Sequence, residues 1–395
     1  MKARNVLIVL LCLFAFISSE TLNTLIIPTI YSSQIIHENA ELGKVYLNTD
    51  ESNTILSKGT DPNQGATLIS KIDNRGGFIY HNSKFNLVYD NSAQIMEKKT
   101  NTEESVYLLY YQNNGKEYFT EFKDKGVDLQ ASKNLETFHA KVSTFTLKNG
   151  LIFFAGIQST SKFAQTNLNI KLYDSQTKTQ LNTGITINAY SHLVSCAEVK
   201  DNEVYCAYIH DENLIKRHLL YLQHFKVTDN GEIIHEEQAY LVKSFYTDFN
   251  MVKVIKISDT EVGIVFQTGN GNEVNNIPFG NTGKDLYFYH LEVSPNKMEV
   301  VRYDYIYNDC RLRADKNDYT VDIISLPNKY IYAICESASD QSAFQLIQVY
   351  GPDKKFTQLT MGNLGKTVKN PQFVRIDDSA AILFTRLFVA SLQSG

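Results

Sequence analysis

The chain has 395 residues, 38 of them Lys or Arg and 43 Asp or Glu, which gives a formal net charge of −5. Hydrophobic residues make up 43% and charged residues 21% of the sequence, an ordinary balance for a globular protein, and this excludes a disordered chain. The basic residues are scattered along the chain. We therefore expect no nucleic-acid partner, because such a partner requires a clustered basic surface.

The first 19 residues have the layout of a secretory signal peptide. Met1 to Arg4 is a short basic start, Val6 to Ile17 is an apolar run, and Ser18-Ser19 supplies small residues for cleavage. The apolar run is too short to span a bilayer, which needs about 20 residues. We therefore expect residues 1–19 to be removed and the protein to be secreted, either extracellular or at the cell surface.

A second membrane segment is not expected in this chain. The best candidate, Ala380 to Leu392, is too short and is interrupted by Arg386.

Residues 20–57 contain several short apolar stretches that read as N-terminal strands, and Pro28 favours an edge position for one of them. Two roles are open for these strands. They could complete the last sheet of the same molecule, or they could pair with a neighbouring molecule in trans.

Residues 58–395 contain a repeated hairpin, which consists of an apolar strand, a tight turn and a second apolar strand. Five copies are clear, and they are Val142–Leu147 with Leu151–Ile157, Leu193–Val199 with Val204–Ile209, Val252–Ile257 with Val262–Phe266, Val321–Leu326 with Tyr330–Cys335, and Phe373–Ile376 with Ala380–Phe384. A further strand pair follows each of the first four copies, whereas residues 68–122 are less regular and read as one unit. Repeated four-stranded meanders of this kind favour a toroid of small sheets.

The sequence thus predicts an all-β fold, a β-propeller of six or seven four-stranded antiparallel blades, with tandem β-sandwiches as the alternative. At the level of fold, the chain resembles a secreted β-propeller over roughly residues 40–395. It matches no specific repeat family. In particular, the absence of Trp removes the repeat families whose motifs contain this residue.

Four cysteines follow the expected signal peptide, and they are Cys196, Cys206, Cys310 and Cys335. An even number of cysteines in an oxidising compartment indicates two disulfides. Cys196 and Cys206 flank one turn and are expected to pair across it, which leaves Cys310 for Cys335. The alternative is that some of the four are buried free thiols.

No motif of known chemistry is visible in the sequence. His210, His218, His224 and His235 are close in sequence but lack the spacing of metal ligands, so we expect ordinary strand histidines. We expect no catalytic residue, no metal and no cofactor.

The first functional hypothesis is a secreted, non-catalytic module that binds or scaffolds protein or glycan, with other copies of the same protein as one candidate partner. One alternative is a self-assembling structural subunit of an extracellular filament or coat. The other is a carbohydrate-active hydrolase, which would need paired carboxylates on the inner strands.

Overall fold

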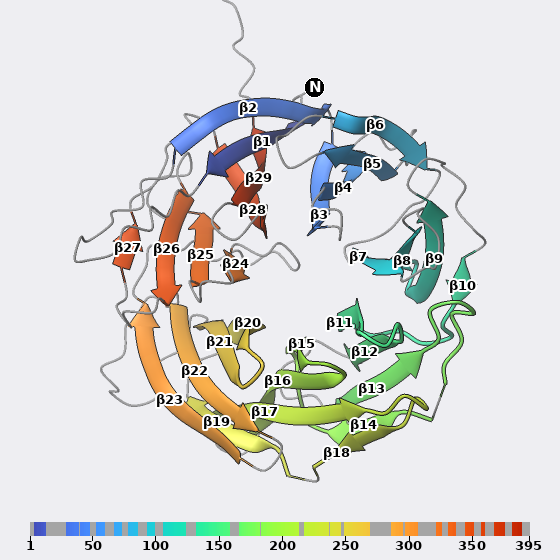
Figure 1. The fold of residues 1–395 in the computed structure, drawn as a ribbon, viewed down its shortest axis with the longest axis vertical. Helices are drawn as coiled ribbons and strands as arrows, with labels where there is room; N and C mark the ends of the chain where they lie inside the picture. Colours follow the sequence, from blue (N-terminus) through green and yellow to red (C-terminus); the bar gives the residue numbers. More distant parts are fainter. Residues whose placement is uncertain are drawn as a thin grey trace, which may run out of the picture.

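The protein is an all-β ring of small sheets around a central axis (Figure 1). The structure is a computed structural model, and the described part of the chain contains strands and turns but no α-helix. The described residues are 4–12, 29–38, 40–47, 53–59, 67–72, 78–85, 93–98, 106–123, 132–158, 166–181, 183–212, 217–236, 238–245, 249–268, 286–294, 297–306, 321–325, 331–336, 344–350, 357–359, 367–375 and 381–388. Within them, no helix is long and apolar enough to cross a membrane.

Seven antiparallel sheets form the ring, and we call them blades 1 to 7 in chain order. Blades 1 to 3 consist of β3 (Ala40–Leu47), β4 (Asn53–Gly59), β5 (Thr67–Ile72) and β6 (Phe78–Phe85); β7 (Ala93–Lys98), β8 (Val106–Asn113), β9 (Lys116–Lys123) and β10 (Lys133–Asn134); and β11 (Lys141–Thr146), β12 (Ile152–Ile157), β13 (Asn167–Tyr173) and β14 (Ile185–Asn188).

Blades 4 to 7 continue the ring. They consist of β15 (Val194–Lys200), β16 (Glu203–Glu212), β17 (Arg217–Val227) and β18 (Ile233–His235), with β19 (Tyr240–Phe245) also on β17; β20 (Phe249–Ser258), β21 (Glu261–Thr268), β22 (Leu286–Ser294) and β23 (Lys297–Ile306); β24 (Val321–Ser325), β25 (Ile331–Glu336), β26 (Phe344–Tyr350) and β27 (Thr357–Leu359); and β28 (Thr367–Arg375), β29 (Ala381–Phe388), β1 (Arg4–Cys12) and β2 (Thr29–Glu38).

The structure confirms the predicted all-β fold and the four-stranded antiparallel blades, and the described strands form seven such sheets, the fourth with β19 as an additional strand. The five hairpins identified from the sequence are the first two strands of blades 3 to 7. In blades 3 and 4 the turns of these hairpins use left-handed backbone, at Gly150 (φ 88°) and Asn202 (φ 61°). Glycine and asparagine accept this conformation at low cost, which is why the sequence marks the turns clearly.

The sequence interpretation of residues 68–122 as a single irregular unit is wrong. These residues are divided between blades 1 and 2, and blade 2 begins with β7, a strand that the sequence analysis missed. The sequence of β7, Ala-Gln-Ile-Met-Glu-Lys, contains only two large apolar residues. The composition of β7 therefore does not predict a strand. Its backbone becomes one by pairing with the strongly apolar β8.

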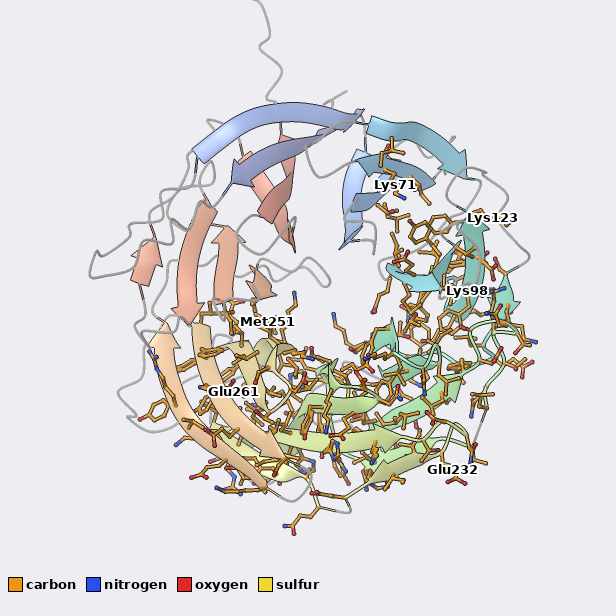
Figure 2. All side chains as sticks on the ribbon, in the orientation of Figure 1. Lys71, Lys98, Lys123, Glu232, Met251 and Glu261 are labelled. Carbon is orange, nitrogen blue, oxygen red and sulfur yellow. A yellow bond between two sulfur atoms is a disulfide. The ribbon has the colours of Figure 1, made fainter. Side chains whose placement is uncertain are left out.

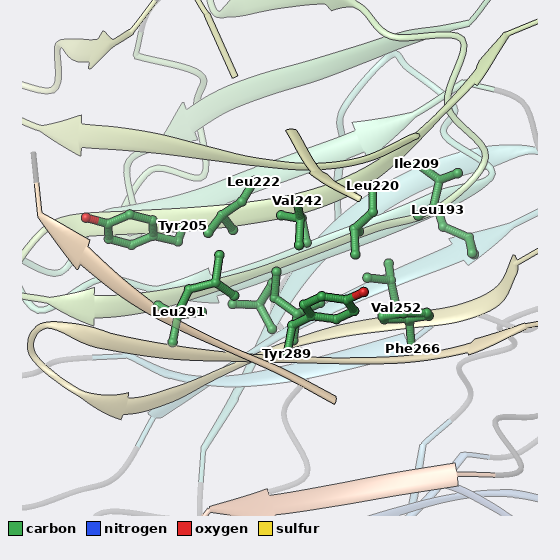
Figure 3. Close-up of a cluster of buried hydrophobic side chains, with 14 of the residues drawn as sticks. Leu193, Tyr205, Ile209, Leu220, Leu222, Val242, Val252, Phe266, Tyr289 and Leu291 are labelled. Atoms are coloured by element: carbon green, nitrogen blue, oxygen red, sulfur yellow. The ribbon is translucent and has the colours of Figure 1, made fainter. Parts of the chain in front are cut away.

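Side chains fill the spaces between blades 3 and 4 and between blades 4 and 5 (Figure 2). Between blades 4 and 5, Tyr205, Leu220 and Leu222 from one sheet face Phe266 and Leu291 from the next (Figure 3). Most of these side chains are fully buried. Because burying a large apolar side chain contributes roughly 1.5–3 kcal/mol, the faces between blades are the main source of stability.

The innermost strands are also connected to one another by polar side chains. Gln94 on β7 bonds both the Val142 carbonyl (2.7 Å) and the Thr144 amide (3.1 Å) of β11. The Ser143 hydroxyl accepts a hydrogen bond from the backbone amide of Cys196 on β15 (3.1 Å). In the same way, the Ser195 hydroxyl accepts one from the backbone amide of Val254 on β20 (3.0 Å). An inner strand exposes one unpaired backbone edge to the channel, and these contacts satisfy part of that edge.

Cys196 and Cys206 form a disulfide between β15 and β16, where they lie directly opposite each other in register. This is the pairing across one turn that the sequence indicates. Cys310 lies outside the described residues, so the pairing of Cys310 with Cys335 stays a prediction.

Residues 20–57, expected as a group of N-terminal strands, contribute β2 to blade 7 and β3 and β4 to blade 1. Arg4–Cys12, within the expected signal peptide, forms β1 between β2 and β29.

We expect Ser195→Ala to lower the free energy of unfolding by about 1–2 kcal/mol, because the Val254 amide then loses its acceptor at the blade 4–5 junction. Denaturant titration of purified protein would measure the change. Lys297→Ala, at an exposed surface ion pair on the outer strand β23, is the matched control and should change stability by less than about 0.5 kcal/mol. Equal effects of both substitutions would contradict a role for the inner-strand contacts.

Candidate functional site

Polar and aromatic side chains gather where β16 ends and β17 begins, next to the segment that enters β15. Six of these residues lie on this side of blade 4, toward blade 3, and we call them the aromatic site: Tyr190, Tyr208, His210, Glu212, Arg217 and Tyr221. Tyr208 is buried and the other five are half-buried. The site is therefore reachable from solvent but is supported by the interior.

Tyr190 has a strained backbone, with φ at 42°. A bulky residue rarely adopts this left-handed conformation, and such strain concentrates at functional positions. Two hydrogen bonds hold the residue in place: its amide donates to the Thr166 carbonyl (3.1 Å), and its carbonyl accepts the Asp211 amide (3.2 Å). The conformation places the Tyr190 ring edge-on to His210, with 5.6 Å between ring centroids.

His210 lies between two tyrosine rings. Tyr190 is on one side, and Tyr221 is on the other with a centroid distance of 6.1 Å. Tyr221 in turn stacks on Tyr208 at 5.7 Å. In the β16–β17 register His210 pairs with Leu219 and Tyr208 with Tyr221, so that these side chains share one face of the sheet. The imidazole is thus fixed by packing on both sides.

Glu212 and Arg217 close the hairpin end of the site. The Arg217 Nε donates to Glu212 Oε2 at 2.7 Å, and the terminal nitrogen NH2 lies 2.7 Å from the same oxygen. This contact holds the pKa of Glu212 below its usual range. Burial, with a further contribution from the Glu212 charge, raises the pKa of Tyr221, so its phenol stays protonated at neutral pH.

On the opposite face of blade 4, Asp211 joins two histidines. Its Oδ2 lies 2.8 Å from His192 Nδ1, and its Oδ1 lies 2.6 Å from His218 Nδ1. His192 Nε2 also faces the Phe249 carbonyl of blade 5 at 3.3 Å. All three side chains are buried. This Asp211 cluster, consisting of His192, Asp211 and His218, fixes the blade 4–5 junction directly behind the aromatic site.

The Asp211 carboxylate is strongly stabilised in its charged form. Burial by itself would raise its pKa, but the hydrogen bonds from His192 and His218 outweigh burial and hold the pKa well below the usual range. Because the Asp211 amide also bonds the Tyr190 carbonyl, the same residue supports both the strained tyrosine and the histidine pair.

A related polar cluster lies between blades 2 and 3. His139, like His192, stands two residues before an inner strand, and its Nδ1 lies 2.9 Å from Glu117 Oε2. Glu117 is fully buried and also accepts Tyr110 Oη at 2.7 Å and the His139 amide at 2.9 Å. Gly156 makes room for this histidine, because a Cβ there would lie 2.6 Å from the His139 ring. With its polar groups satisfied and buried, this cluster joins two blades.

The aromatic site combines a half-buried imidazole, a phenol that stays protonated, and a guanidinium within one face of a hairpin. These groups can accept a proton, donate a proton and attract an anion. Within the described part of the chain, no group of three or more His, Cys, Asp or Glu side chains is arranged to hold a metal ion.

The residues of the aromatic site were not found from the sequence. His210 and His218 were interpreted as ordinary strand histidines, yet they lie in the aromatic site and in the Asp211 cluster respectively. His224 lies toward the other end of β17, where its ring stacks on Tyr205. His235 lies on β18 opposite Phe225 and packs on its ring. The available signal was the alternation of side-chain direction along β16, which places His210 and Asp211 on opposite faces of the sheet. His210 therefore belongs to the aromatic site, whereas His218 lies with Asp211 on the other face.

No protein-family model and no curated protein matches the chain. Among solved structures, an ulvan lyase of polysaccharide lyase family 25 is similar at 10% identity, covering 89% of this chain and 94% of that chain with a TM-score of 0.52. The same lyase bound to -[GlcA(1-4)Rha3S]- covers 90% of this chain and 92% of that chain at 10% identity, with a TM-score of 0.50. A family 93 α-L-arabinofuranosidase of Fusarium graminearum covers 74% and 91% at 12% identity, with a TM-score of 0.44. At 10% identity, the likeness to the lyase shows the β-propeller fold alone.

These neighbours correct one expectation. The sequence analysis took the chain to be a non-catalytic module, whereas the lyase whose structures share its fold over 89% and 90% of its length is an enzyme. The absence of a recognisable motif was a poor reason to exclude catalysis, because catalytic groups on a propeller come from separate strands and loops that carry no common spacing.

We expect Asp211→Asn to lower the free energy of unfolding by about 3 kcal/mol at neutral pH, because it removes the charge that two buried histidines face. The pKa of Asp211 is lowered in the folded state, so its contribution is fully present above the unfolded value of about 4 and is lost as the pH falls through the folded value. The difference between variant and wild type should therefore shrink in acid.

Urea titrations at several pH values would measure both effects. Asp201→Asn, which removes an exposed partner of Lys148, is the control and should cost less than about 1 kcal/mol at any pH. A difference for Asp211→Asn that stays constant down to low pH would contradict the assignment.

Proposed function

We propose that this protein is a secreted carbohydrate-active enzyme that cleaves a uronate-containing polysaccharide by β-elimination, with the aromatic site as its catalytic site. The observation that carries the proposal is His210 held between Tyr190 and Tyr221, with Arg217 at the edge of the same face. These are the groups that elimination next to a carboxylate requires: a base, an acid and a cation.

The roles follow from the position of each group. His210 takes the proton from the sugar carbon next to the carboxylate, and that electron pair forms the new carbon–carbon double bond as the neighbouring carbon–oxygen bond breaks. Tyr221, whose phenol is protonated at neutral pH, gives its proton to the leaving oxygen. Arg217 exchanges its contact with Glu212 for the substrate carboxylate and balances the charge that develops there. Tyr190 packs against the imidazole and fixes its orientation.

Hydrolysis fits the site less well. It needs two carboxylates on either side of one glycosidic bond, about 5–9.5 Å apart. The end of β16 carries two acids, Asp211 and Glu212, which are adjacent and therefore point to opposite faces of the sheet. Asp211 is also buried between its two histidines, away from the aromatic site.

Two further findings support the proposal. The fold is shared with a lyase whose bound ligand, -[GlcA(1-4)Rha3S]-, contains a uronate. The signal-peptide-like start of the sequence and the disulfide in blade 4 favour a secreted protein. A secreted protein would meet such polysaccharides outside the cell.

We expect the purified protein to release products with ultraviolet-absorbing double bonds from ulvan or another uronate-containing polysaccharide, and His210→Ala to lower kcat by about 10²–10⁴-fold through loss of the base. Tyr303→Phe, on the exposed outer face of blade 5, is the matched control and should leave kcat unchanged. A folded protein that releases no unsaturated product from a panel of uronate-containing polysaccharides would contradict the proposal.

We expect Arg217→Ala to raise KM for the acidic polysaccharide by at least about 10-fold, because a charge-assisted contact to a carboxylate contributes about 1.5–3 kcal/mol. Comparing native substrate with substrate whose carboxylates have been reduced to alcohols separates recognition from general damage. The variant should lose the preference for the acidic form, whereas a variant that retains it would show that Arg217 does not face the carboxylate.

A further inference from the structure

Blade 7 is built around a strand that the sequence marks for removal. Its order is β2-β1-β29-β28, so β1 (Arg4–Cys12) has a strand on each side. One edge pairs with β29 from Arg4 opposite Phe388 to Leu11 opposite Ala381. The other edge pairs with β2 from Asn5 opposite Glu38 to Cys12 opposite Thr29.

Cleavage after Ser19, as the sequence predicts, would remove β1 from this sheet. Two backbone edges would then lose their partner at the same time: the edge of β29 and the edge of β2, whose ladder in the described part of the chain is formed with β1. Unpaired backbone groups in a sheet form a template for another strand.

The chain cannot close this gap simply by shifting β2 inward. Because β1 is antiparallel to both neighbours, β2 runs parallel to β29, and direct pairing would create a parallel ladder. All the ladders among the described strands are antiparallel. In addition, β2 ends at Glu38 and β3 begins at Ala40, so β2 is held next to blade 1.

We propose that removal of residues 1–19 turns blade 7 into a strand-acceptor site, in which β29 (Ala381–Phe388) binds an extended apolar strand of another polypeptide in antiparallel register. The occupant seen in the structure defines the chemistry of this strand. The sequence of β1 is apolar at successive positions from Val6 to Leu11, which is typical of a strand covered on both faces. Main-chain hydrogen bonds supply affinity in strand addition of this kind, and side-chain complementarity supplies specificity.

The site is separate from the proposed catalytic site. Blade 7 lies across the ring from blade 4 (Figure 1), so the proposal stands or falls independently of polysaccharide cleavage.

The test uses the chain from Glu20 to Gly395 and a fluorescent peptide with the sequence of Arg4–Leu11 carrying solubilising lysines. We expect saturable binding by fluorescence polarisation, and slower hydrogen exchange at residues 381–388 when the peptide is bound. A peptide with the Ile8→Pro substitution removes a ladder donor in mid-strand and should bind at least 10-fold more weakly. The full chain, with β1 in place, should not bind the peptide.

Three results would overturn the proposal. N-terminal sequencing of the secreted protein could show that residues 4–12 are retained. The shortened chain could protect residues 381–388 from exchange as a monomer without peptide, which would mean that its own chain fills the gap. The two peptides could also bind equally well, which would mean that the contact is not a β-ladder.

Discussion

The structure depends on the packing of apolar sheet faces against one another around a ring. A single four-stranded sheet has two faces and cannot bury both by itself, so each blade is stable only between its neighbours. The junctions between blades 3 and 4 and between blades 4 and 5 show this most fully, with Phe153, Phe225 and Phe266 completely buried. Closure of the ring follows from this requirement, because an open end would leave one such face in water.

Polar groups are placed where the apolar packing ends. On the channel side, Gln94, Ser143 and Ser195 satisfy the backbone edges of the next inner strand. At the strand ends, the buried acids Glu117 and Asp211 each bond to a histidine that precedes an inner strand. These contacts add direction to a non-directional packing force and fix how each blade is rotated against the next.

The aromatic site makes use of this rigidity. Asp211 is anchored in the blade 4–5 junction, and through its backbone amide it holds Tyr190, which packs on His210 at the blade 3–4 junction. The strained backbone of Tyr190 persists because hydrogen bonds hold it on both sides, from its amide to Thr166 and to its carbonyl from Asp211. The polysaccharide cleavage that we propose would need such a preorganised base and acid.

The sequence by itself determined the all-β class, the repeated hairpins of blades 3 to 7 and the disulfide across the Asp201-Asn202 turn. These features depend on local alternation and on turn residues, which are readable within about ten positions. Only the tertiary structure decided that the irregular residues 68–122 belong to two blades, because β7 becomes a strand through its pairing with β8. It alone brought together Tyr190, His210 and Tyr221, because Tyr190 comes from the loop before β15 and is held beside β16 by hydrogen bonds to Thr166 and Asp211. Sequence spacing does not reveal this arrangement, since hydrogen bonds between a loop and a neighbouring strand leave no periodic pattern in the sequence.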